Sequence, residues 1–305
     1  MTAVDTTGLE AILRRDRLVV IAGLAIVIGI AWVWLLLGPG SLFHGESASD
    51  AMDMAPMSPA PMSSAQTGAA TGMAGMTGMA RMTGMAGMTG MSDMVMQPAI
   101  WSPAYAGLML TMWWVMMVAM MLPGATPAVL LFARINRKER LADRPYVPTG
   151  LFAAGYLAVW GGFSALATAL QWKLQGVGLV SSMMTTTSVW LSSAILVAAG
   201  VWQLTPIKSI CLRHCRSPIS FLAQRWRPGR MGAFRLGIDH GAYCLGCCWF
   251  LMGLLFFGGV MNLFWISGLA AFILLEKTLP MGHWFGRFAG VGLIALALRL
   301  FTMSS

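Results

Sequence analysis

The sequence predicts an all-α membrane protein: a polytopic transmembrane helix bundle of about seven spans with a disordered Met-rich external loop. Composition is the first reason, because 57% of the 305 residues are hydrophobic and only 10% are charged, whereas soluble domains carry about 25% charged residues. The second is a series of apolar stretches long enough to cross the bilayer, which takes about 20 helical residues. The third is an excess of methionine, 27 residues, more than the packing of an apolar core requires.

Each apolar stretch is expected to be a helix, because a lone strand cannot satisfy its backbone polar groups in lipid. The first apolar run is longer than the core of a signal peptide, about 7–15 residues, so we expect it to be retained as an anchor. Pro123 and Pro127 are expected to break or kink the second span at its cytoplasmic end. The predicted spans are residues 18–37, 103–122, 151–170, 189–206, 236–258, 264–281 and 287–303.

The distribution of basic residues predicts the orientation in the membrane. Most of the 20 Lys and Arg residues fall in three segments, 14–17, 134–144 and 208–235, which lie on the same side when the spans alternate. The positive-inside rule then places the N-terminus in the cytoplasm of a bacterial inner membrane and residues 39–99 on the periplasmic or extracellular side. This asymmetry accounts for the net charge of +9, so no nucleic-acid partner is expected.

The external segment has a repetitive composition of Met, Gly, Ala, Ser, Thr and Pro that buries too little apolar surface to fold. Thioethers are neutral, soft ligands that prefer Cu(I) to hard cations, and they persist in oxidising compartments where free thiols do not. We interpret the segment as a metal-collecting loop; the alternative is a linker without function. Its regular repeat places a methionine at every third position: Met73, Met76, Met79, Met82, Met85, Met88, Met91 and Met94.

The second span carries a further group of methionines. Met109, Met112, Met116 and Met120 fall on one narrow stripe of a helix with 3.6 residues per turn, and Met117 and Met121 widen it. The stripe is interpreted as a path for a soft metal ion. The alternative is a packed seam between helices, since Met fills irregular gaps well.

Thiol and imidazole side chains gather in two places near the predicted cytoplasmic side. In the fifth span, His240, Cys244, Cys247, Cys248 and Met252 share one helical face. Two thiolates with a ligand from another helix would form a Cu(I) site; a zinc site is possible but has fewer suitable ligands than usual. The alternative is that the cysteines are small buried apolar residues.

The second group lies in the basic segment before the fifth span. Cys211, His214 and Cys215 meet on one face of a helix, and neighbouring basic residues favour the thiolate, which is the metal-binding form. Glu276 in the sixth span is a further candidate, because acids within a membrane usually face a partner or a water path. His240 or an arginine of the cytoplasmic segments is its expected partner.

Four motifs carry a resemblance to a known family: Met112-Trp-Trp-Val-Met-Met-Val-Ala-Met-Met-Leu-Pro123, Lys208-x-x-Cys211-x-x-x-Cys215-Arg-x-Pro218, His240-Gly-x-Tyr-Cys-x-Gly-Cys-Cys-Trp249-x-Leu-Met252, and Glu276-Lys277. Over roughly residues 100–303 the chain resembles a bacterial family of predicted metal-binding integral membrane proteins, domain of unknown function 2182. The resemblance implies a polytopic metal-binding protein without an established activity. The order of its candidate ligands, though not its ancestry, is also similar to that of Ctr-type copper transporters. Those proteins have three spans, whereas this chain has seven predicted ones.

Together these features predict three parts: a cytoplasmic N-terminus and first anchor (1–38), the Met-rich low-complexity loop (39–99) and a six-helix metal-binding membrane domain (100–305). The expected function is Cu(I) acquisition, transport or delivery, with a periplasmic copper protein or a membrane copper enzyme as partner. The alternatives are a membrane copper oxidoreductase and a copper sensor or assembly factor. Because no P-loop is evident, primary pumping by this chain alone is not expected.

Overall fold

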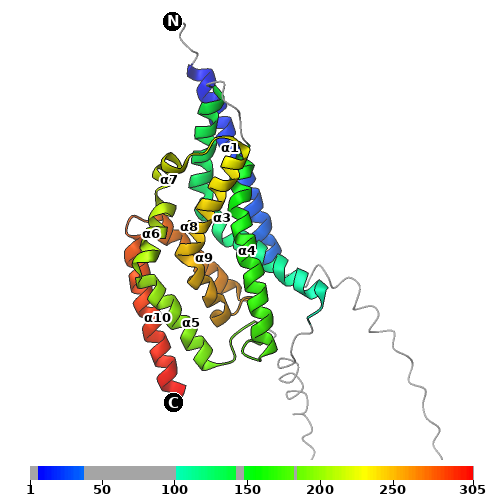
Figure 1. Cartoon of the computed structure of the whole chain (residues 1–305), viewed down its shortest axis with the longest axis vertical. Helices are drawn as coiled ribbons and strands as arrows, with labels where there is room; N and C mark the ends of the chain where they lie inside the picture. Colours follow the sequence, from blue (N-terminus) through cyan, green and yellow to red (C-terminus); the bar gives the residue numbers. More distant parts are fainter. Residues whose placement is uncertain (1–5, 38–100, 142–147, 182–183, 305) are drawn as a thin grey trace, which may run out of the picture. The chain divides into compact units, whose positions relative to one another are not determined.

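The computed structural model describes residues 6–37, 101–141, 148–181 and 184–304. Within these ranges the chain is almost entirely helical, which confirms the predicted all-α bundle (Figure 1). The Met-rich segment 39–99, with Met73 to Met94, lies outside the described residues. The helices are α1 (Thr6–Leu37), α3 (Pro103–Leu141), α4 (Thr149–Gly176), α5 (Val189–Leu204), α6 (Pro206–Arg216), α7 (Pro218–Arg225), α8 (Gly229–Gly258), α9 (Leu263–Thr278) and α10 (Gly282–Ser304).

All seven predicted apolar stretches are helical, but they differ in length. Five helices among the described residues, α1, α3, α4, α8 and α10, are long and apolar enough to cross a membrane. Helices α5 and α6 pass the same test only as a pair, bent by 66°. Helices α5 and α9 have 16 residues each, or about 24 Å at 1.5 Å per residue. The structure therefore supports five or six spans by length and composition, rather than seven.

Helix α3 does not end at its prolines. It continues from Pro103 to Leu141 through both Pro123 and Pro127, so of the two expected outcomes, a break or a kink, the break does not occur. Side chains bond to carbonyl groups next to the first proline: the Tyr156 hydroxyl donates to the Met121 carbonyl over 3.0 Å, and Thr126 Oγ1 donates to Leu122 over 3.1 Å. These bonds tie the segment around Pro123 to α4 and to the next turn of α3; the carbonyl that a proline leaves without its helical donor is the one four residues earlier.

Close packing of α4 against α8 positions the centre of the bundle. Helix α4 runs along α8, α5 along α10 and α1 along α3. A Cβ atom added to Gly155 would overlap the Phe234 carbonyl, and one added to Gly237 would overlap the Phe152 carbonyl. Small residues of this kind let the backbones of two membrane helices approach closely. The approach fixes which face of α8 turns toward the core.

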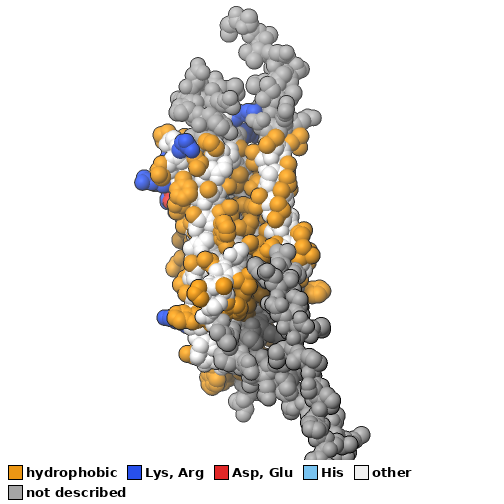
Figure 2. Space-filling view, turned by 90° about the vertical axis from the view of Figure 1, so that its right-hand side faces the viewer, with side chains coloured by type: hydrophobic (Ala, Val, Ile, Leu, Met, Phe, Trp, Pro, Cys, Tyr) orange, Lys and Arg blue, Asp and Glu red, His pale blue; other side chains and the backbone are white. Residues whose placement is uncertain are grey.

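The outer face of the helices is largely apolar. Figure 2 shows hydrophobic side chains spread along the visible face, with the visible Lys and Arg side chains mostly toward its upper end. Large apolar side chains stand exposed on several helices, including Ile26 at 60%, Trp190 at 72% and Phe264 at 94%. A contiguous apolar surface of this extent is unusual for a soluble monomer and marks an interaction with other apolar material, such as lipid.

Candidate metal centre

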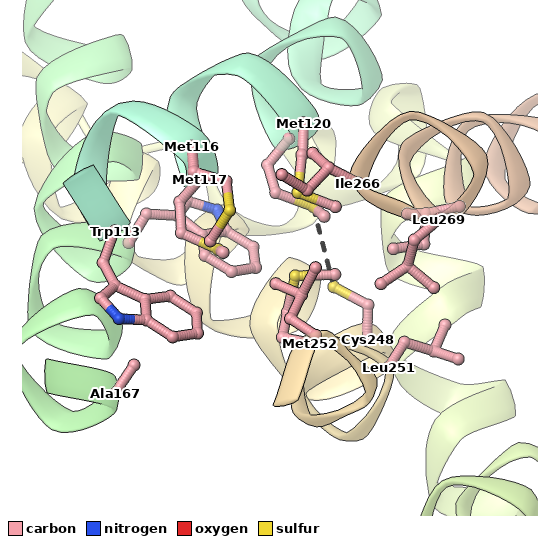
Figure 3. Packing of buried hydrophobic residues seen from close by; sticks show 14 of the residues in the cluster. Trp113, Met116, Met117, Met120, Ala167, Cys248, Leu251, Met252, Ile266 and Leu269 are labelled. Atoms are coloured by element: carbon pink, nitrogen blue, oxygen red, sulfur yellow. Dashed lines mark hydrogen bonds between the residues drawn. The ribbon is translucent and has the colours of Figure 1, made fainter. Parts of the chain in front are cut away.

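Helix α8 brings the predicted face of soft ligands into the core. His240, Cys244, Cys247, Cys248 and Met252 are all buried, with no more than 2% of each residue exposed. The sulfur atoms of this face belong to one apolar cluster with α3 and α9 side chains (Figure 3). Burial alone fits either small apolar cysteines or metal ligands, so the neighbours of these thiols decide what the face can do.

Helix α6 adds two more thiols to this face. Cys215 packs against the buried cluster that contains Cys244 and Cys247. Cys211 lies against the α8 backbone, because a Cβ atom added to Gly246 would come within 3.0 Å of the Cys211 sulfur. All five cysteines are free thiols. Two groups that are separate in sequence therefore form one thiol cluster, defined here as Cys211, Cys215, Cys244, Cys247 and Cys248.

Helix α3 supplies thioethers next to the thiol cluster. Met109, Met112, Met116 and Met120, the predicted stripe, are all buried. A direct sulfur–sulfur contact with α8 is made by Met121, whose Sδ lies 3.9 Å from the Cys248 sulfur. Met121 is 0% exposed. Sequence reasoning placed it at the margin of the stripe, because helical periodicity does not say which edge of the stripe faces another helix.

A polar contact fixes the far end of the same methionine stripe. Gln171 of α4 donates from Nε2 to the Met109 sulfur over 3.5 Å and accepts from Trp113 Nε1 over 2.8 Å. Both Gln171 and Trp113 are fully buried. The Met109 sulfur is therefore held by a hydrogen bond rather than by apolar contacts alone.

Cys244 is the most heavily contacted thiol of the cluster. Lys277 Nζ of α9 donates a hydrogen bond to the Cys244 sulfur over 3.0 Å. The Tyr156 hydroxyl of α4 lies 3.0 Å from the same sulfur. Neither neighbour was predicted from the sequence, because both come from other helices and neither spacing nor residue type points to them.

Glu276 is already paired in the structure. Its carboxylate forms a buried ion pair with Lys208 of α6, and Lys208 also donates to Gln203 Oε1. Among the described residues the partner is therefore Lys208, not His240 or an arginine as expected. Gly286 of α10 lies so close that a Cβ atom there would overlap Glu276 Oε1. The Glu276 carboxylate is thus buried between Lys208 and the backbone of α10.

The two candidate histidines have different surroundings. His240 packs among the rings of Phe152, Tyr156 and Phe221, with ring centroids 5.3–5.9 Å away. Its buried Nδ1 has no hydrogen-bond partner among the described residues, which leaves that atom available as a ligand. His214 instead stacks on Tyr243, with centroids 4.2 Å apart. Both candidate histidines therefore lie against aromatic rings of other helices, His214 through Tyr243 of α8.

The donor set suits a soft monovalent ion. Across the described ranges, no group of three or more His, Cys, Asp or Glu side chains is arranged to hold a metal ion, and a tetrahedral zinc site would need four ligands. Nothing in these ranges therefore supports zinc. Cu(I) is satisfied by two or three sulfur ligands, and both thiols and thioethers are soft ligands that select it. Cys244, Cys247, Cys248 and Met121 supply that chemistry.

Comparison with known proteins agrees with this donor set. Residues 110–300 match the sequence profile of PpoB2, described as a copper chaperone. No curated protein and no solved structure matches the chain significantly. The matched range includes the methionines of α3 from Met112 onward, the thiol cluster and Lys277. It covers more than half of the chain, so the protein belongs to the PpoB2 copper chaperone family.

Proposed function

We propose that the protein is a membrane-embedded chaperone that receives Cu(I) on thioethers and holds it on the thiol cluster. The observation that carries the proposal is the contact between Met121 of α3 and Cys248 of α8, where the sulfur atoms lie 3.9 Å apart. A Cu(I) ion bound by the thioether is within reach of the thiol. Membership of the copper chaperone family supports copper as the cargo.

The order of ligands gives the ion a direction. Thioethers are neutral and bind Cu(I) weakly, whereas thiolates are charged and bind it more strongly. An ion that arrives along Met109, Met112, Met116 and Met120 gains affinity when it reaches Cys248, Cys247 and Cys244. The buried surroundings of these thiols exclude water and other ligands, so the ion is released only to a partner with competing sulfur ligands.

The remaining parts of the proposal concern the setting of the protein. The apolar helices cross a bacterial inner membrane, with α1 retained as an anchor and the N-terminus in the cytoplasm. The Met-rich loop 39–99 collects the ion on the periplasmic or extracellular side. The receiving partner is a periplasmic copper protein or a membrane copper enzyme. Five apolar helices and the clustering of basic residues in three segments support this setting.

Copper binding to the purified full-length protein tests the proposal. The protein in detergent is titrated with Cu(I) under anaerobic, reducing conditions against a chromogenic Cu(I) chelator, and metal content is measured by plasma mass spectrometry. The triple variant Cys244→Ser, Cys247→Ser, Cys248→Ser is expected to lose the tight site, because hydroxyls are poor ligands for a soft ion. Unchanged Cu(I) affinity in the folded triple variant, or stoichiometric zinc in place of copper, contradicts the proposal.

Met121→Leu tests the transfer step separately. Leu keeps the apolar volume but removes the thioether, so copper loading of the thiol cluster is expected to slow while its final affinity stays the same. The matched control is Met231→Leu on α8, because Met231 is 63% exposed. Stopped-flow mixing with the Cu(I)–chelator complex measures the loading rate. Equal rates in the two variants would remove Met121 from the route.

A further inference from the structure

A buried lysine lies against the proposed copper ligands. Lys277 is 8% exposed, and its Nζ donates to the Cys244 sulfur over 3.0 Å. An ammonium group has donors and no acceptor, so the sulfur is the acceptor in this contact. Positive charge next to a thiol favours the thiolate.

The structure leaves Lys277 without a carboxylate partner. Within the part of the chain that is described, the nearest acid in sequence, Glu276, is paired with Lys208, and the other ion pairs join Arg225 and Arg227 to Asp239. Lys208 and Glu276 cancel each other in charge. Lys277 thus remains as one buried positive charge, and burying an uncompensated charge is costly. Among the described residues, the anion closest to the ammonium group is the thiolate form of Cys244, which accepts its hydrogen bond.

Gly124 of α3 leaves room for the Lys277 side chain. A Cβ atom added to Gly124 would lie 3.2 Å from Lys277 Cδ and 3.6 Å from Nζ. Any larger residue at position 124 would crowd the lysine stem. The glycine directly after Pro123 therefore leaves the space through which Lys277 reaches Cys244.

We propose that Lys277 is the counter-charge of the copper complex: its ammonium group, admitted past Gly124, balances one negative charge on a Cu(I) ion held by Cys244 and a second thiolate. One Cu(I) and two thiolates together carry a single negative charge. Cys244 already faces the ammonium group as a thiolate, so copper binding releases one proton to solvent, that of the second thiol. One thiolate with a thioether would be neutral and would leave Lys277 uncompensated. This inference rests on the proposed function and specifies which ligands the bound ion takes.

The test measures both affinity and ligand type in the full-length protein in detergent, with Cu(I) as the probe. Lys277→Gln is expected to weaken Cu(I) binding by about 10- to 100-fold, the usual effect of removing a group that supports metal ligands. Lys277→Arg keeps the charge and is expected to restore most of the affinity. Lys173→Gln is the matched control, because it removes an exposed lysine of α4.

X-ray absorption spectroscopy at the copper edge gives a readout that a purely structural role would not change. Wild-type protein is expected to show two thiolate sulfurs on the ion. Lys277→Gln is expected to shift the ion toward one thiolate and one longer thioether bond, because that complex is neutral. Gly124→Ala, which keeps the lysine but crowds its stem, is expected to shift the spectrum in the same direction, whereas Gly107→Ala, whose Cβ atom meets nothing within 4 Å, leaves it unchanged.

A double variant separates an effect of Lys277 on Cys244 from a general loss of structure, which would lower the affinity of the double variant further. When Lys277 acts through Cys244, Lys277→Gln added to Cys244→Ser costs no further affinity, because interacting residues are not additive. Equal affinity and identical spectra in wild type and Lys277→Gln overturn the inference while the cysteine variants still lose copper. Failure of the proposed function looks different, because then neither the cysteine variants nor the lysine variant changes copper binding.

Discussion

At the scale of single residues, the centre is built from polar groups that each bind more than one partner. The Tyr156 hydroxyl donates to the Met121 carbonyl of α3 and lies 3.0 Å from the Cys244 sulfur of α8. One side chain from α4 therefore connects α3, which carries the methionines, to α8, which carries the cysteines. Lys208 of α6 also contacts two other helices, through Gln203 of α5 and Glu276 of α9.

Tyr156→Phe is expected to lower the stability of the folded protein. The variant keeps the ring but loses a buried hydrogen bond, which contributes about 1 kcal/mol to the free energy of unfolding. Thermal unfolding in detergent measures the effect as a lower Tm. Tyr105→Phe, on a half-buried ring that packs edge-on against Trp101, is the control. A Tm decrease of the same size in both variants would contradict a joining role for the Tyr156 hydroxyl.

At the scale of the elements, close contact between α4 and α8 determines where the thiol face points. Gly155 and Gly237 let each helix approach a carbonyl of the other. Gly237 stands one turn before Gly241, which meets the Val159 side chain of α4. The row of small residues holds α8 in one rotation about its axis, with the cysteines turned toward α3 and α6.

Gly237→Ala is expected to destabilise the bundle by about 1–3 kcal/mol, the usual cost of overpacking. The added methyl group would overlap the Phe152 carbonyl, which cannot move without shifting α4. Gly253→Ala on the same helix meets nothing within 4 Å and is expected to be neutral or slightly stabilising, because Ala favours helix over Gly. Tm values of the two variants, measured together, check the difference; equal values would argue against the close contact.

At the scale of the whole molecule, the helical bundle and the Met-rich loop are expected to have separate roles. The family match begins at residue 110 and ends at residue 300, so it includes the thiol cluster and excludes residues 39–99. A chaperone built in this way binds its cargo in the bundle. The loop then affects how fast copper is captured from dilute solution.

Deletion of residues 45–98 tests this division. The shortened protein is expected to keep the tight Cu(I) site of the thiol cluster and to lose the additional, weaker copper bound by thioethers. Inductively coupled plasma mass spectrometry of both proteins, before and after washing with a weak Cu(I) chelator, measures the amounts of weakly and tightly bound copper. Loss of the tight site in a shortened protein that is still folded would mean that the loop supplies ligands to it.

The sequence predicted the helices well, because an apolar run of this length has few alternatives to a helix. All seven stretches are helical, and α8 carries His240, Cys244, Cys247 and Cys248 into the core. Periodicity along one helix also identified the buried methionine stripe of α3. The prolines were less informative, because they predict either a break or a kink, and α3 continues through Pro123 without a break.

The contacts between helices could not be predicted from the sequence. The pairing of Glu276 with Lys208 joins residues 68 positions apart, and the contact of Lys277 with Cys244 joins residues 33 apart. No spacing rule links such positions, because their distance depends on how each helix is rotated and how closely it packs. His214 shows the same effect, since it stacks on Tyr243 of another helix.

The sequence by itself determined that this is an apolar helical protein rich in soft ligands, because composition and helical periodicity are local properties. Only the tertiary structure decided that Met121 meets Cys248, that α6 and α8 share one thiol cluster and that Lys277 faces Cys244. The physical reason is that a ligand set is defined by distances between helices. Those distances depend on glycine contacts and on a buried ion pair that join parts of the chain far apart in sequence.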